Sequence, residues 1–243
     1  MARHVSFDEE PVAELDSEAI DFRVASESFA ETRRLRRSDL ATLGLVTTHQ
    51  GRTVPTVGGL LLFGRDRLAT FPDAWVQAGR FAGTERTGII DSVELQGNSL
   101  PAMVDDAIGF VDRHLATGLV IEGVRHRRTP RPVPTVAVRE AVINSVVHAD
   151  YSQSGAPIRV AVFDDRVEIE NPGLLPFGMT VDDMRNGVSR VRNRILARTF
   201  RELDEIAGTR LASLVDRGLI VDIGSGPNDP QRRYYPSAPA VRG

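Results

Sequence analysis

The spacing of apolar positions changes several times along the chain, and each change marks an expected element. Apolar residues recur every three or four positions over 100–115, which predicts a helix with one buried face. A shorter helical pattern covers 38–46, and the runs 74–81 and 89–95 are typical of strands. Residues 55–66 admit a buried helix or a phosphate-cradling turn. Leucines, rather than the Lys-Ser/Thr of a P-loop, follow their paired glycines, which favours close helix packing.

Polar residues spaced by four interrupt the apolar pattern of 139–151, a segment that Thr135 could cap as a helix. Glu140, Asn144 and His148 fall within a stripe about 80° wide along one face of that helix. Two interpretations stay open, a solvated polar face and a binding site. In a site, the Asn144 amide oxygen suits Mg²⁺, and the Glu140 carboxylate could orient or deprotonate a water that attacks a phosphate.

A hairpin and a sharp turn follow this helix. Residues 156–163 and 167–170 alternate as two strands around a turn at 164–166, and Asn-Pro-Gly stands at 171–173. Upstream of the helix, the basic and proline-rich segment 123–134 lacks any sustained apolar period. We therefore expect a domain boundary there.

Composition and charge narrow the chemistry. The chain has no cysteine, which excludes a thiolate nucleophile and Cys-based metal sites, and no lysine, which excludes lysine Schiff-base and P-loop chemistry. With 30 basic and 33 acidic residues the net charge is −3, so any DNA binding must be local. Neither a signal peptide nor a run of about 18 apolar residues is visible, so we expect a cytoplasmic protein without a membrane segment.

The motifs resemble the GHKL-type, Bergerat-like ATP-binding fold, in the RecG-C-terminal-like form found in bacterial Alba- and Schlafen-type transcriptional regulators. REAVINSVVHADYS and RVEIENPGLL carry the resemblance, and RNRILARTFREL at 192–203 resembles a further helix of that family. The resemblance implies an α/β fold with a mixed, mainly antiparallel sheet and helices on one face.

The resemblance also implies a division of the chain into three parts. Residues 1–125 would form a small α/β connector region, and the Alba-like domain that precedes this connector in the family has no counterpart in the sequence. Residues 126–206 would form the nucleotide-binding domain. Residues 207–243 would form a partial winged-helix-like tail, with two strands around a wing turn.

Roles for single residues on the predicted helix follow from the same resemblance. Glu140 corresponds to the water-activating residue and Asn144 to the ligand of Mg²⁺. His148 and Asp150 would lie near the phosphates of ATP. Ala149 departs from the family pattern, which has an arginine at that position where it could touch phosphate.

The turn and the lid complete the implied site. Asn171 takes the place of an adenine-reading aspartate, and Gly173 would allow the nucleotide to approach closely. The glycine-rich lid of the family is reduced to residues 207–209, and so short a segment offers few backbone N–H groups to an anion.

The C-terminal part has an excess of arginine, which either a solvated surface or phosphate contacts with DNA would explain. These residues are Arg190, Arg192, Arg194, Arg198, Arg201, Arg210, Arg217, Arg232 and Arg233.

Three functions are consistent with the sequence. The leading one is an ATP-binding regulatory protein that acts in transcription through a DNA-binding tail. It would be at most a weak Mg²⁺-dependent ATPase. The alternative is a shortened, lidless scaffold that serves as a non-catalytic interaction or homodimerisation module. The third, metal-dependent hydrolysis by Glu140, His148 and Asp150, is disfavoured because no HxxxH or HExxH spacing occurs.

Overall fold

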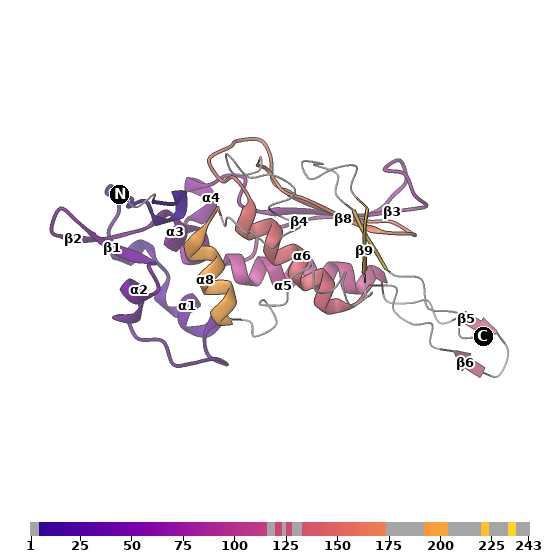
Figure 1. The fold of residues 1–243 in the computed structure, drawn as a ribbon, viewed down its shortest axis with the longest axis horizontal. Helices are drawn as coiled ribbons and strands as arrows, with labels where there is room; N and C mark the ends of the chain where they lie inside the picture. Colours follow the sequence, from indigo (N-terminus) through magenta and orange to yellow (C-terminus); the bar gives the residue numbers. More distant parts are fainter. Residues whose placement is uncertain are drawn as a thin grey trace.

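The computed structural model describes residues 5–115, 133–173 and 192–203, and the backbone of four short strands outside these ranges (Figure 1). The four strands are β5 (Val120–Glu122), β6 (Arg125–Arg127), β9 (Ile220–Ile223) and β10 (Arg233–Pro236). Within the described chain, no helix combines the length and the apolar character needed to cross a membrane.

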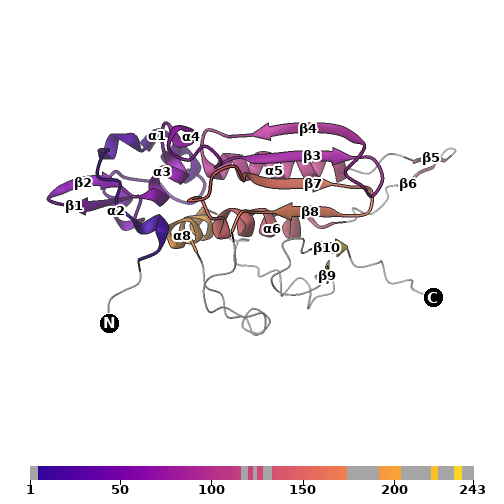
Figure 2. The same cartoon turned by 90° about the horizontal axis from the view of Figure 1, so that it is seen from above.

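The main sheet has six strands in the order β4-β3-β7-β8-β10-β9. The first four strands in this order lie side by side in Figure 2 and are β4 (Ile89–Leu95), β3 (Val76–Phe81), β7 (Ile158–Val162) and β8 (Val167–Glu170). Neighbouring strands are antiparallel except β3 and β7, which are parallel with Val76 opposite Ile158. This is the mixed, mainly antiparallel sheet expected from the sequence.

Two helices, α5 (Leu100–Leu115) and α6 (Thr135–His148), cover one face of the sheet (Figure 2). Val104 and Val111 of α5 are buried as its apolar period predicts. They belong to one core that also includes Val146 of α6 and the inward side chains of β3 and β7. The α/β fold class is confirmed, as are the helix expected at 100–115 and the strands expected at 74–81 and 89–95.

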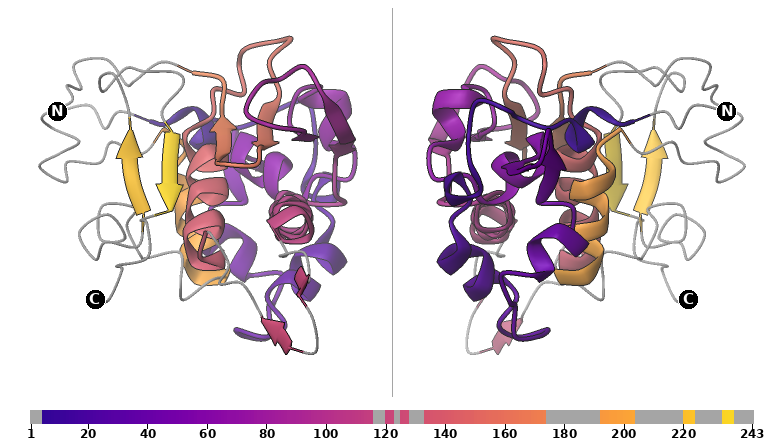
Figure 3. Two further views of the ribbon diagram at one scale, coloured as in Figure 1. Left: turned by 90° about the vertical axis from the view of Figure 1, so that its right-hand side faces the viewer. Right: turned by 90° about the vertical axis from the view of Figure 1, so that its left-hand side faces the viewer.

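The elements that precede β3 gather at one end of the sheet, next to α8 (Arg194–Leu203) (Figures 1 and 3). They are η1 (Phe7–Glu9), η2 (Ser17–Ala19), α1 (Phe22–Ser28), α2 (Asp39–Thr42), β1 (Val46–His49), β2 (Arg52–Pro55), α3 (Val57–Phe63) and α4 (Arg67–Thr70). Strands β1 and β2 pair as a separate hairpin. Helix α8 contacts η1, α3 and α6, so it joins this end of the molecule to the helix layer.

Helix α3 is buried along its whole length, which explains the paired glycines of 55–66. The Thr56 hydroxyl caps the helix by accepting the N–H of Gly59 at 3.0 Å. A Cβ on Gly59 would overlap the carbonyl oxygen of Leu45, so only glycine permits this approach. The favoured interpretation of 55–66 as a buried helix is confirmed.

The helix expected over 38–46 is wrong in its length, because α2 ends at Thr42. Gly44 has a φ of +74°, a left-handed conformation that commonly ends a helix. Val46 then begins β1. A local backbone reversal therefore splits what the apolar spacing alone presents as one helix.

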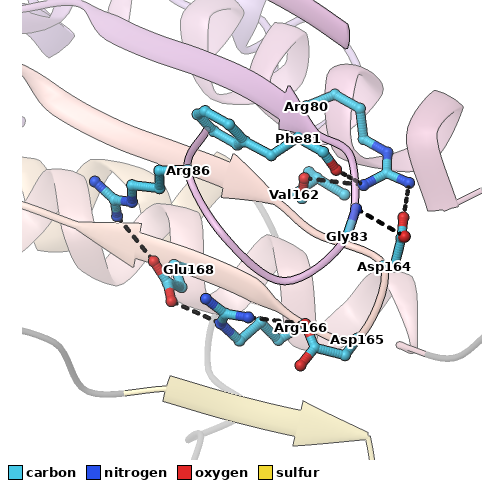
Figure 4. A network of polar contacts seen from close by, with 9 residues as sticks. All are labelled: Arg80, Phe81, Gly83, Arg86, Val162, Asp164, Asp165, Arg166 and Glu168. Atoms are coloured by element: carbon cyan, nitrogen blue, oxygen red, sulfur yellow. Dashed lines mark hydrogen bonds and ion pairs between the residues drawn. The ribbon is translucent and has the colours of Figure 1, made fainter. Parts of the chain in front are cut away.

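A network of ion pairs joins the connecting loops at the end of the sheet that lies away from α8 (Figure 4). Arg80 at the end of β3 forms an ion pair with Asp164 in the turn between β7 and β8. Arg86 and Arg166 both bind the buried carboxylate of Glu168, at 2.8 and 2.7 Å. These contacts hold the β3–β4 connection against the β7–β8 hairpin, and we interpret this network as structural.

The predicted domain boundary after residue 125 stays a prediction. Strands from before it, β3 and β4, share one sheet with β7 and β8 from after it. Strands β9 and β10 pair with each other as the two expected wing strands would, and Tyr234 of β10 also lies opposite Val167 of β8. The expected tail helix, the wing turn and the lid remnant at 207–209 lie outside the described residues.

Candidate nucleotide-binding site

Helix α6 carries the three predicted polar residues in one row. About 6 Å of helical rise separates Glu140 from Asn144, and the same rise separates Asn144 from His148. The Asn144 Nδ2 donates to Glu140 Oε1 at 3.1 Å. Glu140 is only 5% exposed, whereas Asn144 and His148 are half-buried. A freely solvated face would leave the carboxylate exposed, so the row is a partly enclosed polar strip.

The start of α6 differs from the expectation. The helix begins at Thr135 itself, with Pro134 in the N-cap position and no side-chain capping bond from it. Proline at this point sets the φ angle for helix entry, so a hydroxyl cap is not required there. The prediction that Thr135 caps the helix is wrong.

Side chains from elsewhere in the chain close the C-terminal end of α6. Asn193, which directly precedes α8, donates from Nδ2 to the carbonyl oxygens of Val147 and Ala149, both at 2.9 Å. The Tyr151 hydroxyl donates to the carbonyl oxygen of Val146 at 2.9 Å. These bonds satisfy carbonyl groups that the helix leaves unpaired at its end, and they fix the start of α8 against α6.

Asp150 is the centre of a small polar cluster just beyond α6. Its carboxylate accepts the N–H and hydroxyl of Ser152 at 3.2 and 2.5 Å and the side-chain amide of Gln153 at 3.2 Å. Arg192 Nη1 lies 3.0 Å from the second oxygen. Partial burial opposes ionisation, but the hydrogen bonds from Ser152 and the charge of Arg192 outweigh it and hold the pKa of Asp150 below its ordinary value.

The Asn-Pro-Gly turn at 171–173 packs on this cluster. The Asp150 N–H donates to the Pro172 carbonyl oxygen at 2.8 Å. Gly173 has a φ of +130°, and a Cβ there would lie 3.3 Å from the Asp150 Cβ and 3.5 Å from the His148 carbonyl oxygen. Asn171 is exposed beside it. Glycine therefore lets the turn lie directly against the end of α6.

His148 is held in its neutral form. Burial is the main reason that its pKa lies below the ordinary value of 6.5, and the nearby positive charge of Arg192 lowers it further. A neutral imidazole can donate one hydrogen bond and accept another, so at neutral pH the group is suited to hydrogen bonding rather than to ion pairing.

The N-terminus of α8 is occupied by a carboxylate from the start of the chain. Asp8 is fully buried and accepts the N–H groups of Arg194, Ile195 and Leu196 at 3.0, 2.5 and 3.0 Å. The Ser6 hydroxyl adds a fourth bond at 2.5 Å. These amides would otherwise attract an anion, so in this structure the protein supplies that anion itself.

The structure thus brings four of the six predicted residues to one place and sets two at a distance along the helix. His148 and Asp150 lie against the turn of Asn171 and Gly173, while Asn144 and Glu140 lie one and two turns further back along α6.

Neither Arg192 nor Asn193 was predicted to neighbour this cluster. Arg192 was expected in a solvated or DNA-facing arginine surface, whereas it binds Asp150. The signal that could have found both residues is the Arg-Asn pair that opens the segment 192–203.

Metal-dependent hydrolysis is not supported. Within the described ranges, no group of three or more His, Asp or Glu side chains could hold a metal ion. Glu140, His148 and Asp150 all lie in these ranges, and about 12 Å of helical rise separates the first two. They therefore do not form a metal-ligand set.

Comparison with protein families gives one match, over residues 155–226, to the family described as "Putative ATP-dependent DNA helicase recG C-terminal". This range includes β7, β8, the 171–173 turn and α8, and it begins after α6. The match supports an ATPase-like domain. Such a domain suggests binding of a nucleotide together with Mg²⁺.

A solved structure shares the fold. It is the DIP2311 protein from Corynebacterium diphtheriae, with a TM-score of 0.61 and 19% sequence identity. The similarity covers 97% of this chain and 48% of that one, so the chain spans about half the length of the protein that it resembles. Among curated proteins, none matches this sequence.

Proposed function

We propose that this chain is an ATP-binding regulatory protein whose nucleotide site is formed by α6 and the 171–173 turn. The observation that carries the proposal is the partly enclosed row of Glu140, Asn144 and His148, which leads directly to the cluster of Asp150 and the turn. An ordinary packed helix has no reason to place a buried carboxylate and an amide in contact along such a row.

The residues fit a bound Mg²⁺. Because the Asn144 Nδ2 donates to Glu140, the orientation of the amide is fixed and Oδ1 is the atom left to face a cation. A neutral amide oxygen, water and phosphate oxygens are the ligands that Mg²⁺ prefers. Asn144 would therefore hold the ion, which would neutralise charge on the phosphates when bound.

The other residues would act around that ion. Glu140, hydrogen-bonded to the metal-binding amide, would orient or deprotonate a water. Neutral His148 would hydrogen-bond the phosphates, with Asp150 close by. At the turn, Asn171 would read adenine and Gly173 would let the base approach the backbone.

The regulatory part of the proposal rests on the sequence of the tail. The arginine-rich residues after 207 would contact DNA phosphates. The protein would act in transcription, in the cytoplasm, and would form a homodimer. The divisions at 125 and 206 belong to the same proposal.

Thermal unfolding with and without nucleotide tests the proposal. A ligand at 100 times its dissociation constant adds about 2.7 kcal/mol, which raises Tm by about 5–10 °C for a chain of this size. We expect ATP with Mg²⁺ to give such a shift and Asn144→Ala to abolish it while leaving the Tm of the free protein nearly unchanged. Asn98→Ala, an exposed asparagine outside the site, is the matched control.

Two results would contradict the proposal. If millimolar ATP with Mg²⁺ does not shift the wild-type Tm, the non-catalytic scaffold becomes the better account. If Asn144→Ala unfolds the free protein at a much lower temperature, the polar row is packing rather than a site.

A further inference from the structure

We infer that Arg192 is the residue that contacts the phosphates of the bound nucleotide, and that Asp150 is its positioning residue. The inference rests on the proposed nucleotide site and assigns the residue that supplies positive charge within it. From the sequence, Asp150 itself was expected near the phosphates and Arg192 had no expected part in this site.

The charges of the cluster require a cation. The hydrogen bonds from Ser152 and the charge of Arg192 keep Asp150 ionised, and His148 is neutral at pH 7. Triphosphate is strongly anionic and bound Mg²⁺ compensates only part of its charge, so phosphate beside the Asp150 carboxylate needs a further positive group. Arg192 brings a guanidinium to the same end of α6, 3.0 Å from the Asp150 carboxylate and near enough to His148 to lower its pKa.

Two other sources of positive charge can be set aside. The chain contains no lysine. The N-terminal amides of α8, the usual backbone site for a phosphate, already donate to Asp8 through three bonds, two of them buried. An arginine side chain is therefore the natural phosphate-binding group here, and its planar set of N–H donors matches phosphate oxygens.

Arg192 is fixed in position before any ligand arrives. Its neighbour Asn193 is bonded to the last turn of α6, and Asp8 holds the first turn of α8. Asp150 in turn is held by Ser152 and Gln153 and holds the guanidinium.

The Arg192 side chain is 26% exposed, so a ligand can reach it. A cation held in place in this way loses little conformational freedom when it binds phosphate. This is why we assign Asp150 a positioning role rather than contact with the ligand.

Titration calorimetry with ATP, ADP and adenosine, each with Mg²⁺, tests the inference on the full chain. We expect Arg192→Gln to weaken ATP binding at least tenfold and to change adenosine binding less than twofold. Arg192→Lys should recover part of the lost ATP affinity because it keeps the positive charge. Asp150→Asn should show the same selectivity with a smaller loss. Arg201→Gln, an exposed arginine on α8, is the matched control and should bind as the wild type.

The outcomes separate this inference from the proposed function. Wild-type protein that binds no nucleotide refutes both. If the wild type binds ATP and Arg192→Gln binds it equally well, the site stands and the assignment of Arg192 is wrong. Equal weakening of ATP and adenosine in Arg192→Gln and Arg192→Lys also overturns the assignment, because it shows that Arg192 supports the fold of the site rather than the phosphates.

Discussion

Asp8 joins η1, near the start of the chain, to α8, and Asp8→Ala should be among the most destabilising substitutions. The carboxylate is 0% exposed and accepts the amides of Ile195 and Leu196 within the core and that of Arg194 nearer the surface. Alanine removes every one of these acceptors at once. No other described contact ties the first turn of the chain to α8 as closely.

The magnitude follows from the groups left without an acceptor. A buried donor that loses its partner costs about 1–3 kcal/mol, and two such donors are fully enclosed here. Burying the carboxylate is itself unfavourable, which offsets part of the loss: burial raises the pKa of Asp8 above its ordinary value of 3.8 despite the four hydrogen bonds that it accepts. We therefore expect Asp8→Ala to lower the free energy of unfolding by about 2–4 kcal/mol.

The same burial sets the sign of a pH effect. Because the folded pKa of Asp8 is raised, the native state binds the proton more tightly than the unfolded state. The stability that Asp8 gains from this tighter proton binding is complete below pH 3.8 and is lost as the pH rises through the folded pKa. The stability of the wild type relative to Asp8→Asn, which cannot titrate, should therefore increase as the pH falls from 7 towards 4.

Urea unfolding followed by circular dichroism measures both effects. Asp16→Ala is the control, because Asp16 caps η2 through a single bond at an exposed site and should cost about 1 kcal/mol at most. If Asp8→Ala is no more destabilising than Asp16→Ala, then the buried carboxylate does not support α8 and the reasoning is wrong.

Four further substitutions test other parts of the structure. Gly59→Ala should destabilise the protein by about 2 kcal/mol or more, because its Cβ would overlap the Leu45 backbone. Gly109→Ala should stabilise it by about 0.5–1 kcal/mol, because a Cβ at this position of α5 has open space around it. Urea unfolding midpoints measure both changes. His148 resists protonation in the native state, so stability should fall as the pH drops below 6.5, and this fall should be smaller in His148→Gln, as Tm measured against pH will show. Gly173→Ala should cost about 1–3 kcal/mol and weaken ATP binding, since alanine is strained at a φ of +130° and would press on the cluster; an unchanged affinity would separate the turn from the site.

Local periodicity predicted much of the fold. Helix α5 and strands β3 and β4 appear where their apolar spacing places them, because each depends on side-chain patterns only a few residues long. The length of helix α2 was overestimated because a single left-handed residue, Gly44, interrupts an otherwise continuous helical pattern.

Contacts between segments far apart in the chain could not be predicted from the sequence. The bonds from Asp8 to α8 join residues 186 to 188 positions apart, and the Arg192–Asp150 pair spans 42. Neither leaves a periodic signal, so each residue looks like an ordinary surface charge. The row on α6 was predictable because its spacing is helical, but its partial burial depends on how the helix packs between the sheet and α8.

The most direct test of the central claim is equilibrium binding of ATP to the intact protein, measured by calorimetry with Mg²⁺ and again with the metal chelated. The proposed site predicts saturable binding of one nucleotide per chain that weakens without Mg²⁺ and is lost in Asn144→Ala. Absence of saturable binding in the presence of Mg²⁺, or binding that Asn144→Ala leaves intact, would contradict a nucleotide site on α6.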